Sequence, residues 1–329
     1  MDMKNTLRAL CEAFGPTGRE TRVAGIIEDM VKDYADEIRH DALGNLIAIR
    51  HGKGKRKRIM LAAHMDQIGF IVTGVDENGF LRIHPLGGIA RNVTLGRKVV
   101  FENGVEGVIY FEQMSEGGSF DVDMKRMFID IGAATRAEAL SKVQIGDAAT
   151  YAPGVIDMGA RMSSPAMDNR AGCAVLVELL RDMQTDNEVA CVFSTQEEVG
   201  LRGAKAAAFA LDPDMGIALD VTPTRDTPKG FPHSVVLGEG PTIKIMDTSL
   251  ICNPQVVADM RAAADRAGVK YQDEVLTGGG TDGAAMQLTR GGVPSGVISI
   301  PCRYVHTPVE MVEISDVEGA VKILKELVK

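Results

Sequence analysis

The chain has 329 residues, of which 36 are Lys or Arg and 45 are Asp or Glu, so its formal charge is −9. A single core rarely grows beyond roughly 250–300 residues, so we expect two domains or one domain with a large insertion. A hydrophobic content of 45% and a charged content of 25% exclude a wholly disordered chain. The acidic balance argues against a nucleic-acid binder, which normally carries a basic face. No apolar run approaches the roughly 18–20 residues that span a bilayer, and we expect neither a membrane segment nor a signal peptide.

The cysteines indicate a reducing compartment. There are five, an odd number, and none forms a CxxC pair: Cys11, Cys173, Cys191, Cys252 and Cys302. This pattern is typical of buried thiols rather than of a disulfide framework or a thiolate zinc site. We therefore expect a cytoplasmic protein.

Residues 1–67 read as helices followed by strands. Thr17-Gly18-Arg19-Glu20 has the spacing of a capping box and precedes apolar residues at three- and four-residue intervals. It predicts an amphipathic helix that runs to about Asp36. The runs 45–49 and 58–63 predict strands. The basic segment HGKGKRKR (51–58) lies between them and contains two glycines, which favours a solvated hairpin tip over a nucleic-acid patch.

Residues 68–160 have a different composition. Short runs of Gly, Val, Ile and Phe alternate with turn signals such as Glu77-Asn78-Gly79 and Glu102-Asn103-Gly104. This is the pattern of hairpins in a small β-barrel, with one short helix near 135–142. We therefore predict an inserted β-domain at 68–160.

Helices and strands alternate from Asp168 to the C-terminus. The predicted helices are 171–183, 201–209, 254–267, 281–289 and 315–328, and the predicted strands are 189–194, 215–221, 270–276 and 295–300. Such alternation predicts an α/β fold with a parallel or mixed sheet covered by helices. The first part (1–67) and the last part (161–329) then form one catalytic domain that the β-insert interrupts.

Chemically useful side chains follow five separate segments of this α/β layer. Sheets of this kind bind ligands beyond the carboxyl ends of their strands, which is where these residues fall. They are His64 and Asp66, Glu197 and Glu198, Asp220, His306, and Asp168 at the start of a helix.

Histidine and carboxylate side chains suit zinc, cobalt or manganese. Two His and three carboxylates can complete two metal sites if one carboxylate bridges. In His64-x-Asp66, His64 can ligate a metal while Asp66 orients its ring. The neighbours Glu197 and Glu198 must diverge, so one can hold metal and the other stay free as a base. Two such metals would activate water and polarise a carbonyl.

Each of these residues also has an ordinary structural explanation. Asp168 could simply cap its helix, paired Glu residues often form a charged loop, and His306 alone is uninformative. Asp220 lies in an apolar strand, where an unpaired carboxylate is costly. Four other histidines, His40, His51, His84 and His233, have no comparable carboxylate setting, and we expect them at structural or surface positions. It is the joint pattern that predicts a site.

An ordered set of motifs resembles the M42 family of metalloaminopeptidases, which includes glutamyl-aminopeptidase and "endoglucanase M" relatives. The motifs are AAHMDQIGFIV, MDNRAGCAVLVELL, STQEEVGLRGA, ALDVT and IPCRYVHTPVE. The resemblance covers essentially the whole chain. It implies that Asp168 bridges two divalent metals, that Glu198 and His306 complete one site, and that His64 and Asp220 complete the other.

The same resemblance implies the remaining roles. Glu197 would be the general base and acid, and Asp66 would orient His64. The expected fold is a zinc-peptidase α/β/α sandwich with a PDZ-like β-barrel used in assembly, and many members form tetrahedral dodecamers built from dimers. The substrates would be short peptides, from which the enzyme removes N-terminal residues.

Alternative functions fit the sequence less well. A related dinuclear hydrolase, either a deacylase or a carboxypeptidase, is the nearest alternative. A glycoside hydrolase is disfavoured because the chain has no Trp and only 5% aromatic residues. A pure binding module would leave the convergent ligand-type residues unexplained. The Gly-rich loop 277–283 lacks the P-loop lysine, which disfavours nucleotide binding. It is either an ordinary strand–helix turn or, as the resemblance implies, a border of the substrate pocket. A nucleophilic Cys302 is disfavoured because His306 belongs to the proposed ligand set.

Overall fold

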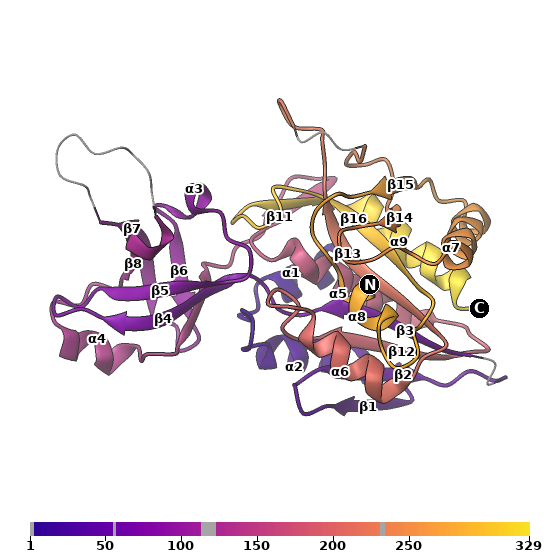
Figure 1. The fold of residues 1–329 in the computed structure, drawn as a ribbon, viewed down its shortest axis with the longest axis horizontal. Helices are drawn as coiled ribbons and strands as arrows, with labels where there is room; N and C mark the ends of the chain where they lie inside the picture. The colour runs from indigo at the N-terminus through magenta and orange to yellow at the C-terminus, as the bar shows by residue number, and fades with distance from the viewer. Residues whose placement is uncertain (1–2, 55–56, 113–122, 231–233) are drawn as a thin grey trace.

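The computed structural model describes residues 3–54, 57–112, 123–230 and 234–329, and over these residues the chain forms two bodies (Figure 1). The larger body contains a mixed eleven-stranded sheet. Along the main path, the order is β1 (Glu37–His40), β2 (Leu46–Arg50), β12 (Glu188–Ser194), β3 (Arg58–His64), β13 (Met215–Pro223), β16 (Ser295–Arg303), β17 (Glu310–Glu313), β11 (Arg161–Ser164) and β10 (Ile156–Asp157). Off this path, β14 (Thr242–Met246) pairs with β16 and with β15 (Gln272–Val275).

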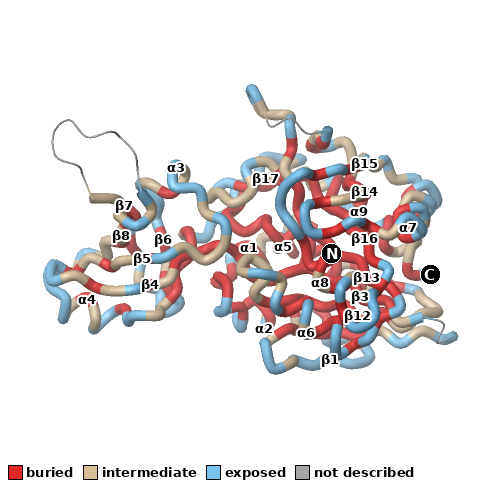
Figure 2. Tube along the Cα trace, viewed as in Figure 1, coloured by how far each residue is buried: buried red, intermediate tan, exposed pale blue. Residues whose placement is uncertain are grey.

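Four neighbouring strands in the centre of this sheet run parallel. β12 pairs with β3, β3 with β13, and β13 with β16, so their carboxyl ends meet at one edge. Their apolar runs are buried on both faces, as parallel strands require. Figure 2 shows the buried residues concentrated along these strands and the exposed ones at the periphery.

Helices cover both faces of the sheet. One face contacts α5 (Met167–Asp182) and α9 (Ile314–Leu327), around which α1 (Met3–Cys11), α2 (Thr21–Val31) and α7 (Pro254–Ala267) pack. The other face contacts α6 (Arg202–Leu211) and α8 (Asp282–Gln287), which also touch each other. The layered α/β fold predicted for the two ends of the chain is thereby confirmed.

The smaller body is a closed antiparallel barrel with strand order β4-β5-β8-β7-β6-β9. Its strands are β4 (Gly69–Val75), β5 (Leu81–Leu86), β6 (Lys98–Phe101), β7 (Glu106–Phe111), β8 (Met127–Asp130) and β9 (Ala148–Tyr151), joined by α3 (Arg91–Thr94), the 3₁₀ turn Met124–Arg126 and α4 (Arg136–Lys142). Its core is separate from that of the sheet and includes an edge-to-face pair of Phe70 and Tyr151, with ring centroids 5.6 Å apart. The predicted β-barrel and its short helix are confirmed.

Two local predictions near the N-terminus are wrong. The helix ends at Val31 rather than near Asp36, because the Asp36 N–H donates to Ile49 O at 2.8 Å and so joins the sheet. The capping box does not form either. Glu20 occupies the N-cap position without a side-chain cap, and the Thr17 hydroxyl donates to Asp66 instead.

The predicted hairpin between the second and third strands is also wrong. β2 and β3 are not neighbours, because β12 lies between them, antiparallel to β2 and parallel to β3. The basic segment 51–58 is therefore a crossing connection, and its residues 55–56 lie outside the described part of the chain.

No helix in the described part of the chain is long and apolar enough to cross a membrane. All five cysteines are buried and unpaired, as predicted. Of the histidines set aside as structural, His40 lies beside Glu28 and His51 beside Glu188, whereas His233 lies outside the described residues.

Candidate active site

The candidate site lies at the carboxyl edge of the parallel strands. His64 is the last residue of β3, Asp220 lies near the end of β13, and Glu197 and Glu198 follow β12. Asp168 opens α5, and His306 follows β16. The sheet brings together all five segments that the sequence pointed to.

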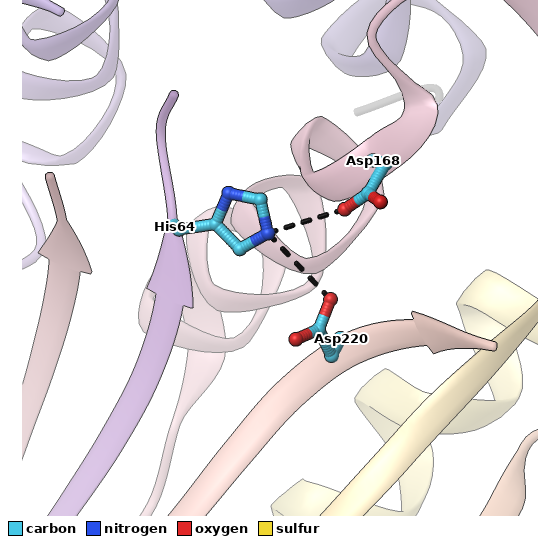
Figure 3. A group of neighbouring side chains, drawn as sticks. All are labelled: His64, Asp168 and Asp220. Carbon is cyan, nitrogen blue, oxygen red and sulfur yellow. Dashed lines mark ion pairs between the residues drawn. The ribbon is translucent and has the colours of Figure 1, made fainter. Parts of the chain in front are cut away.

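Two groups of side chains in this site could each hold a metal ion, and they share one member. In the first, His64 Nε2 lies 3.1 Å from Asp168 Oδ1 and 3.6 Å from Asp220 Oδ1 (Figure 3). In the second, His306 Nε2 lies 3.3 Å from Asp168 Oδ2 and 3.3 Å from Glu198 Oε2. The potential ligand atoms within each group lie within 4.8 Å of one another. Asp168 thus presents one carboxylate oxygen to each group.

The chemistry of these residues fits divalent cations. Imidazole and carboxylate are the donors that zinc, cobalt and manganese accept. Asp168 Oδ1 is buried and, in the described part of the chain, accepts no hydrogen bond besides its ion pair with His64, so a bound cation would relieve a costly arrangement.

The electrostatics of the cluster favour positive charge. Burial opposes protonation of His64, but the carboxylates of Glu197, Asp168 and Asp220 outweigh it and raise the pKa of His64 well above its usual value. Burial likewise opposes protonation of His306, whose pKa Asp168 and Glu198 nevertheless raise to about 12. A site that holds protons this strongly on two imidazoles is one that attracts cations.

Glu197 differs from the ligand carboxylates. Its nearest approach to His64 Nε2 is 3.9 Å, and it belongs to neither group. Burial, reinforced by the negative charges of Asp220, Asp282 and Glu198, raises the pKa of Glu197 well above its usual value, although His64 opposes this. A carboxyl group whose proton affinity is raised in this way is suited to accept a proton from a neighbouring group.

Asp66 connects the end of β3 to the Glu197–Glu198 turn. Its carboxylate accepts hydrogen bonds from the Thr17 hydroxyl at 2.8 Å and from the backbone N–H groups of Glu197 at 3.0 Å and Glu198 at 3.3 Å. His64 Nδ1 lies 3.0 Å from the Asp66 backbone oxygen and 3.6 Å from its carboxylate. Asp66 therefore fixes the backbone that carries Glu197 and Glu198, and its backbone oxygen contacts the imidazole of His64.

Three further buried groups were not predicted from the sequence. Glu310 accepts hydrogen bonds from the backbone N–H groups of Asp168 at 2.9 Å and His306 at 2.8 Å, and so positions two ligands. Arg170 is fully buried and donates to carbonyls around the end of β3. Lys244 lies buried in the cavity wall. For Arg170 and Lys244, the available signal was a charged residue in a largely apolar helix or strand.

The site opens into a cavity of about 410 Å³. One edge of the cavity comes from the segment after β5, where Gly87 and Gly88 approach the ligands closely. A Cβ on Gly88 would lie 2.9 Å from His306 Nδ1, and one on Gly87 would lie 2.9 Å from Glu198 Oε2. Gly279 and Gly280 of the predicted Gly-rich turn also line the cavity.

Comparison with known proteins identifies the family. The M42 glutamyl aminopeptidase profile matches residues 44–323. The chain belongs to the M42 peptidase family. It is an aminopeptidase, a hydrolase of peptide bonds, and M42 peptidases are metal-dependent.

Relatives align with this M42 aminopeptidase along nearly its full length. A predicted aminopeptidase of Acetivibrio thermocellus is 47% identical over 328 residues, which cover 99% of this chain and 98% of that one. The lysyl aminopeptidase of Pyrococcus furiosus is 35% identical over 345 residues, covering 98% and 96%. The TET1 peptidase of Pyrococcus horikoshii, which can assemble into a tetrahedron or a large octahedral shell, superimposes with a TM-score of 0.89 at 32% identity, covering 99% of each chain.

Proposed function

We propose that this M42 aminopeptidase is a dinuclear enzyme that releases N-terminal residues from short peptides, with Glu197 as its general base. The observation that carries the proposal is the position of Asp168, whose two carboxylate oxygens face two different histidines. A single shared carboxylate is what allows five ligands to complete two sites.

The proposed metal ligands fall into two sets that share Asp168. Glu198 and His306 complete one site, and His64 and Asp220 complete the other. Zinc suits this ligand set, and so do cobalt and manganese. When bound, two divalent ions supply the Lewis acid that polarises the scissile carbonyl and lowers the pKa of a water molecule.

The chain's own residues then move the proton. Glu197, free of the ligand groups, accepts the proton of the attacking water and delivers it to the leaving amine nitrogen. Asp66 positions Glu197 through its backbone N–H. Burial of Glu197 favours its protonated form, which is the form that donates the proton to the leaving amine.

A matched pair of variants tests this assignment. Glu197→Gln keeps the shape but cannot accept the water proton, so we expect activity on an aminoacyl-p-nitroanilide to fall by about 10²–10⁴-fold. Its metal content, measured by elemental analysis, should stay near two ions per chain. Glu198→Gln should instead lose metal from one site. The reverse pattern would show that base and ligand are exchanged, and full activity with one ion or fewer would rule out the dinuclear site.

The proposal extends to the organisation of the chain. We assign residues 1–67 and 161–329 to the catalytic domain and 68–160 to an insert whose PDZ-like barrel serves assembly, because the barrel contributes none of the proposed ligands. Within this insert the barrel strands end at Tyr151, and β10 (Ile156–Asp157) already pairs with β11 in the large sheet. The proposed assembly is a homododecamer built from dimers, and a TET1 structure that is 33% identical to this chain, with a TM-score of 0.89, has a dodecamer in its asymmetric unit. Five buried free thiols support a cytoplasmic location. Light scattering of the metal-loaded protein tests the assembly, and a monomer at micromolar concentration would contradict it.

A further inference from the structure

Among the described residues, the cavity wall beyond the proposed ligands and Glu197 is apolar except for one cation. Apart from the ligands and Glu197, the side chains that line it are Leu201, Val221, Pro223, Lys244, Leu276 and Val305. From this wall and from the surroundings of Lys244, we infer that the enzyme selects peptides whose N-terminal side chain is uncharged and apolar. The inference rests on the proposed function and names the substrate class of that site.

The charge of Lys244 is already balanced inside the protein. Lys244 lies on β14 and is 1% exposed. Its Nζ is 3.3 Å from Glu274 Oε1 and 3.6 Å from Asp247 Oδ2. Both carboxylates are buried, so this cluster carries two negative charges around one positive charge.

Both carboxylates are held in place from behind. Glu274 accepts hydrogen bonds from the hydroxyls of Thr222 at 2.6 Å and Thr242 at 2.5 Å. Asp247 Oδ1 accepts from the Ser249 hydroxyl and from the backbone N–H groups of Ser249 and Leu250, each at 2.8 Å. Neither Glu274 nor Asp247 is among the described residues that line the cavity, so Lys244 separates them from a substrate.

This arrangement disfavours a charged side chain of either sign. An acidic side chain that reached Lys244 would be the third carboxylate around one ammonium, repelled by two that are fixed. A basic side chain would meet the like charge of Lys244, with the balancing carboxylates behind it. In both cases a charge loses water without a free partner, which is costly.

An apolar side chain has no such penalty. It can contact Leu201, Val221 and Leu276, and a buried methylene in an apolar pocket changes kcat/KM by about 10-fold or more. The names of the relatives do not decide the matter, because the family is called glutamyl and the Pyrococcus furiosus relative lysyl. Specificity must therefore come from this chain's own cavity wall.

A panel of substrates tests the inference on the metal-loaded protein. The kcat/KM values of leucyl-, methionyl-, glutaminyl-, glutamyl- and lysyl-p-nitroanilide are compared. We expect kcat/KM for the leucyl and methionyl substrates to exceed that for the glutamyl and lysyl substrates by at least 10-fold. The glutaminyl substrate has the shape of the glutamyl one without its charge, and its kcat/KM should also exceed the glutamyl value. Glutamyl or lysyl rates equal to the leucyl rate would overturn the specificity alone. Hydrolysis of none of the five would overturn the proposed function.

A matched pair of variants then tests the wall itself. Leu276→Glu places an unpaired carboxylate in the cavity wall, and we expect the lysyl-to-leucyl ratio of kcat/KM to rise at least 10-fold. Leu288→Glu makes the same change at the end of α8, where Leu288 is 79% exposed and outside this cavity, and should leave the ratio unchanged. An unchanged ratio in folded Leu276→Glu, or equal changes in both variants, would overturn the placement. If Leu276→Glu fails to fold, the wild-type panel still decides.

Discussion

Replacing Arg170 by Met should destabilise the fold by about 4 kcal/mol. Arg170 is fully buried, and its guanidinium joins the end of α1 to the end of β3. It donates to the backbone oxygens of Met65 at 2.7 Å and Ala13 at 3.2 Å, and also to those of Leu10 and Gly15.

The magnitude follows from which acceptors lose every donor. Leu10 O and Gly15 O each keep a backbone N–H donor, from Ala13 and Gln67 respectively. Met65 O and Ala13 O have no second donor among the described residues, and neither has the buried Gln67 Oε1, to which Arg170 also donates at 3.3 Å. A buried oxygen left unsatisfied costs about 1–3 kcal/mol, so three cost about 3–9 kcal/mol, and the value lies toward the lower end because the bonds to Ala13 O and Gln67 Oε1 are long. Methionine retains most of the packing of the arginine stem, so the change mainly removes the hydrogen bonds.

Urea unfolding followed by circular dichroism measures this loss. Arg8→Met is the control, because the contact that Arg8 makes in the described part of the chain is an i,i+4 pair with Glu12, 3.6 Å apart, and its side chain is 40% exposed. The control should lose less than about 0.5 kcal/mol. If the free energy of unfolding of Arg170→Met is within about 1 kcal/mol of that of the control, the carbonyls have other donors and the reasoning fails.

Two further predictions concern buried and partly buried carboxylates. Glu310→Gln leaves only one side-chain oxygen to accept from the N–H groups of Asp168 and His306. Metal affinity, measured by chelator competition, should therefore fall about 10–100-fold, as when other groups that support metal ligands are removed. Unchanged affinity would contradict the positioning role of Glu310. Burial opposes ionisation of Asp226, but the salt bridge from Arg303 at 2.6 Å, helped by hydrogen bonds from the Thr224 hydroxyl and the Leu237 N–H, outweighs it and lowers the pKa of Asp226 from 3.8 to about 2. Because the ionised form is favoured by folding, this stability is present above pH 3.8 and is lost as the pH falls through about 2. Arg303→Met should therefore cost about 1 kcal/mol at pH 7, after allowance for solvent screening, and progressively less between pH 4 and 2. Thermal unfolding at these pH values measures it, and a pH-independent cost would refute the assignment.

The sequence predicted those features that depend on local pattern. The ends of β3, β12 and β13 are marked by an apolar run followed within a few residues by His64, Glu197 or Asp220, so both the strands and their functional edge were visible. The barrel was predicted for the same reason, because its turn signals lie between short apolar runs.

Features that depend on distant parts of the chain were not predictable in this way. The order β2-β12-β3 places a strand that is far away in sequence between two consecutive ones, so the expected hairpin was wrong. Thr17 resembled a helix cap because the carboxylate that binds its hydroxyl belongs to Asp66, 49 residues away. Glu310 acts on backbone N–H groups, and backbone partners leave no trace in residue types.

The close approach of Gly87 and Gly88 to Glu198 and His306 limits how the chain can be shortened. The inserted barrel leaves the sheet just after Asp66 and supplies part of the rim against which two candidate ligands rest. Excising the whole insert would remove that rim and open one side of the cavity to solvent. A minimal catalytic unit must therefore keep the segment at 87–88, even if every barrel strand beyond it is replaced by a short linker.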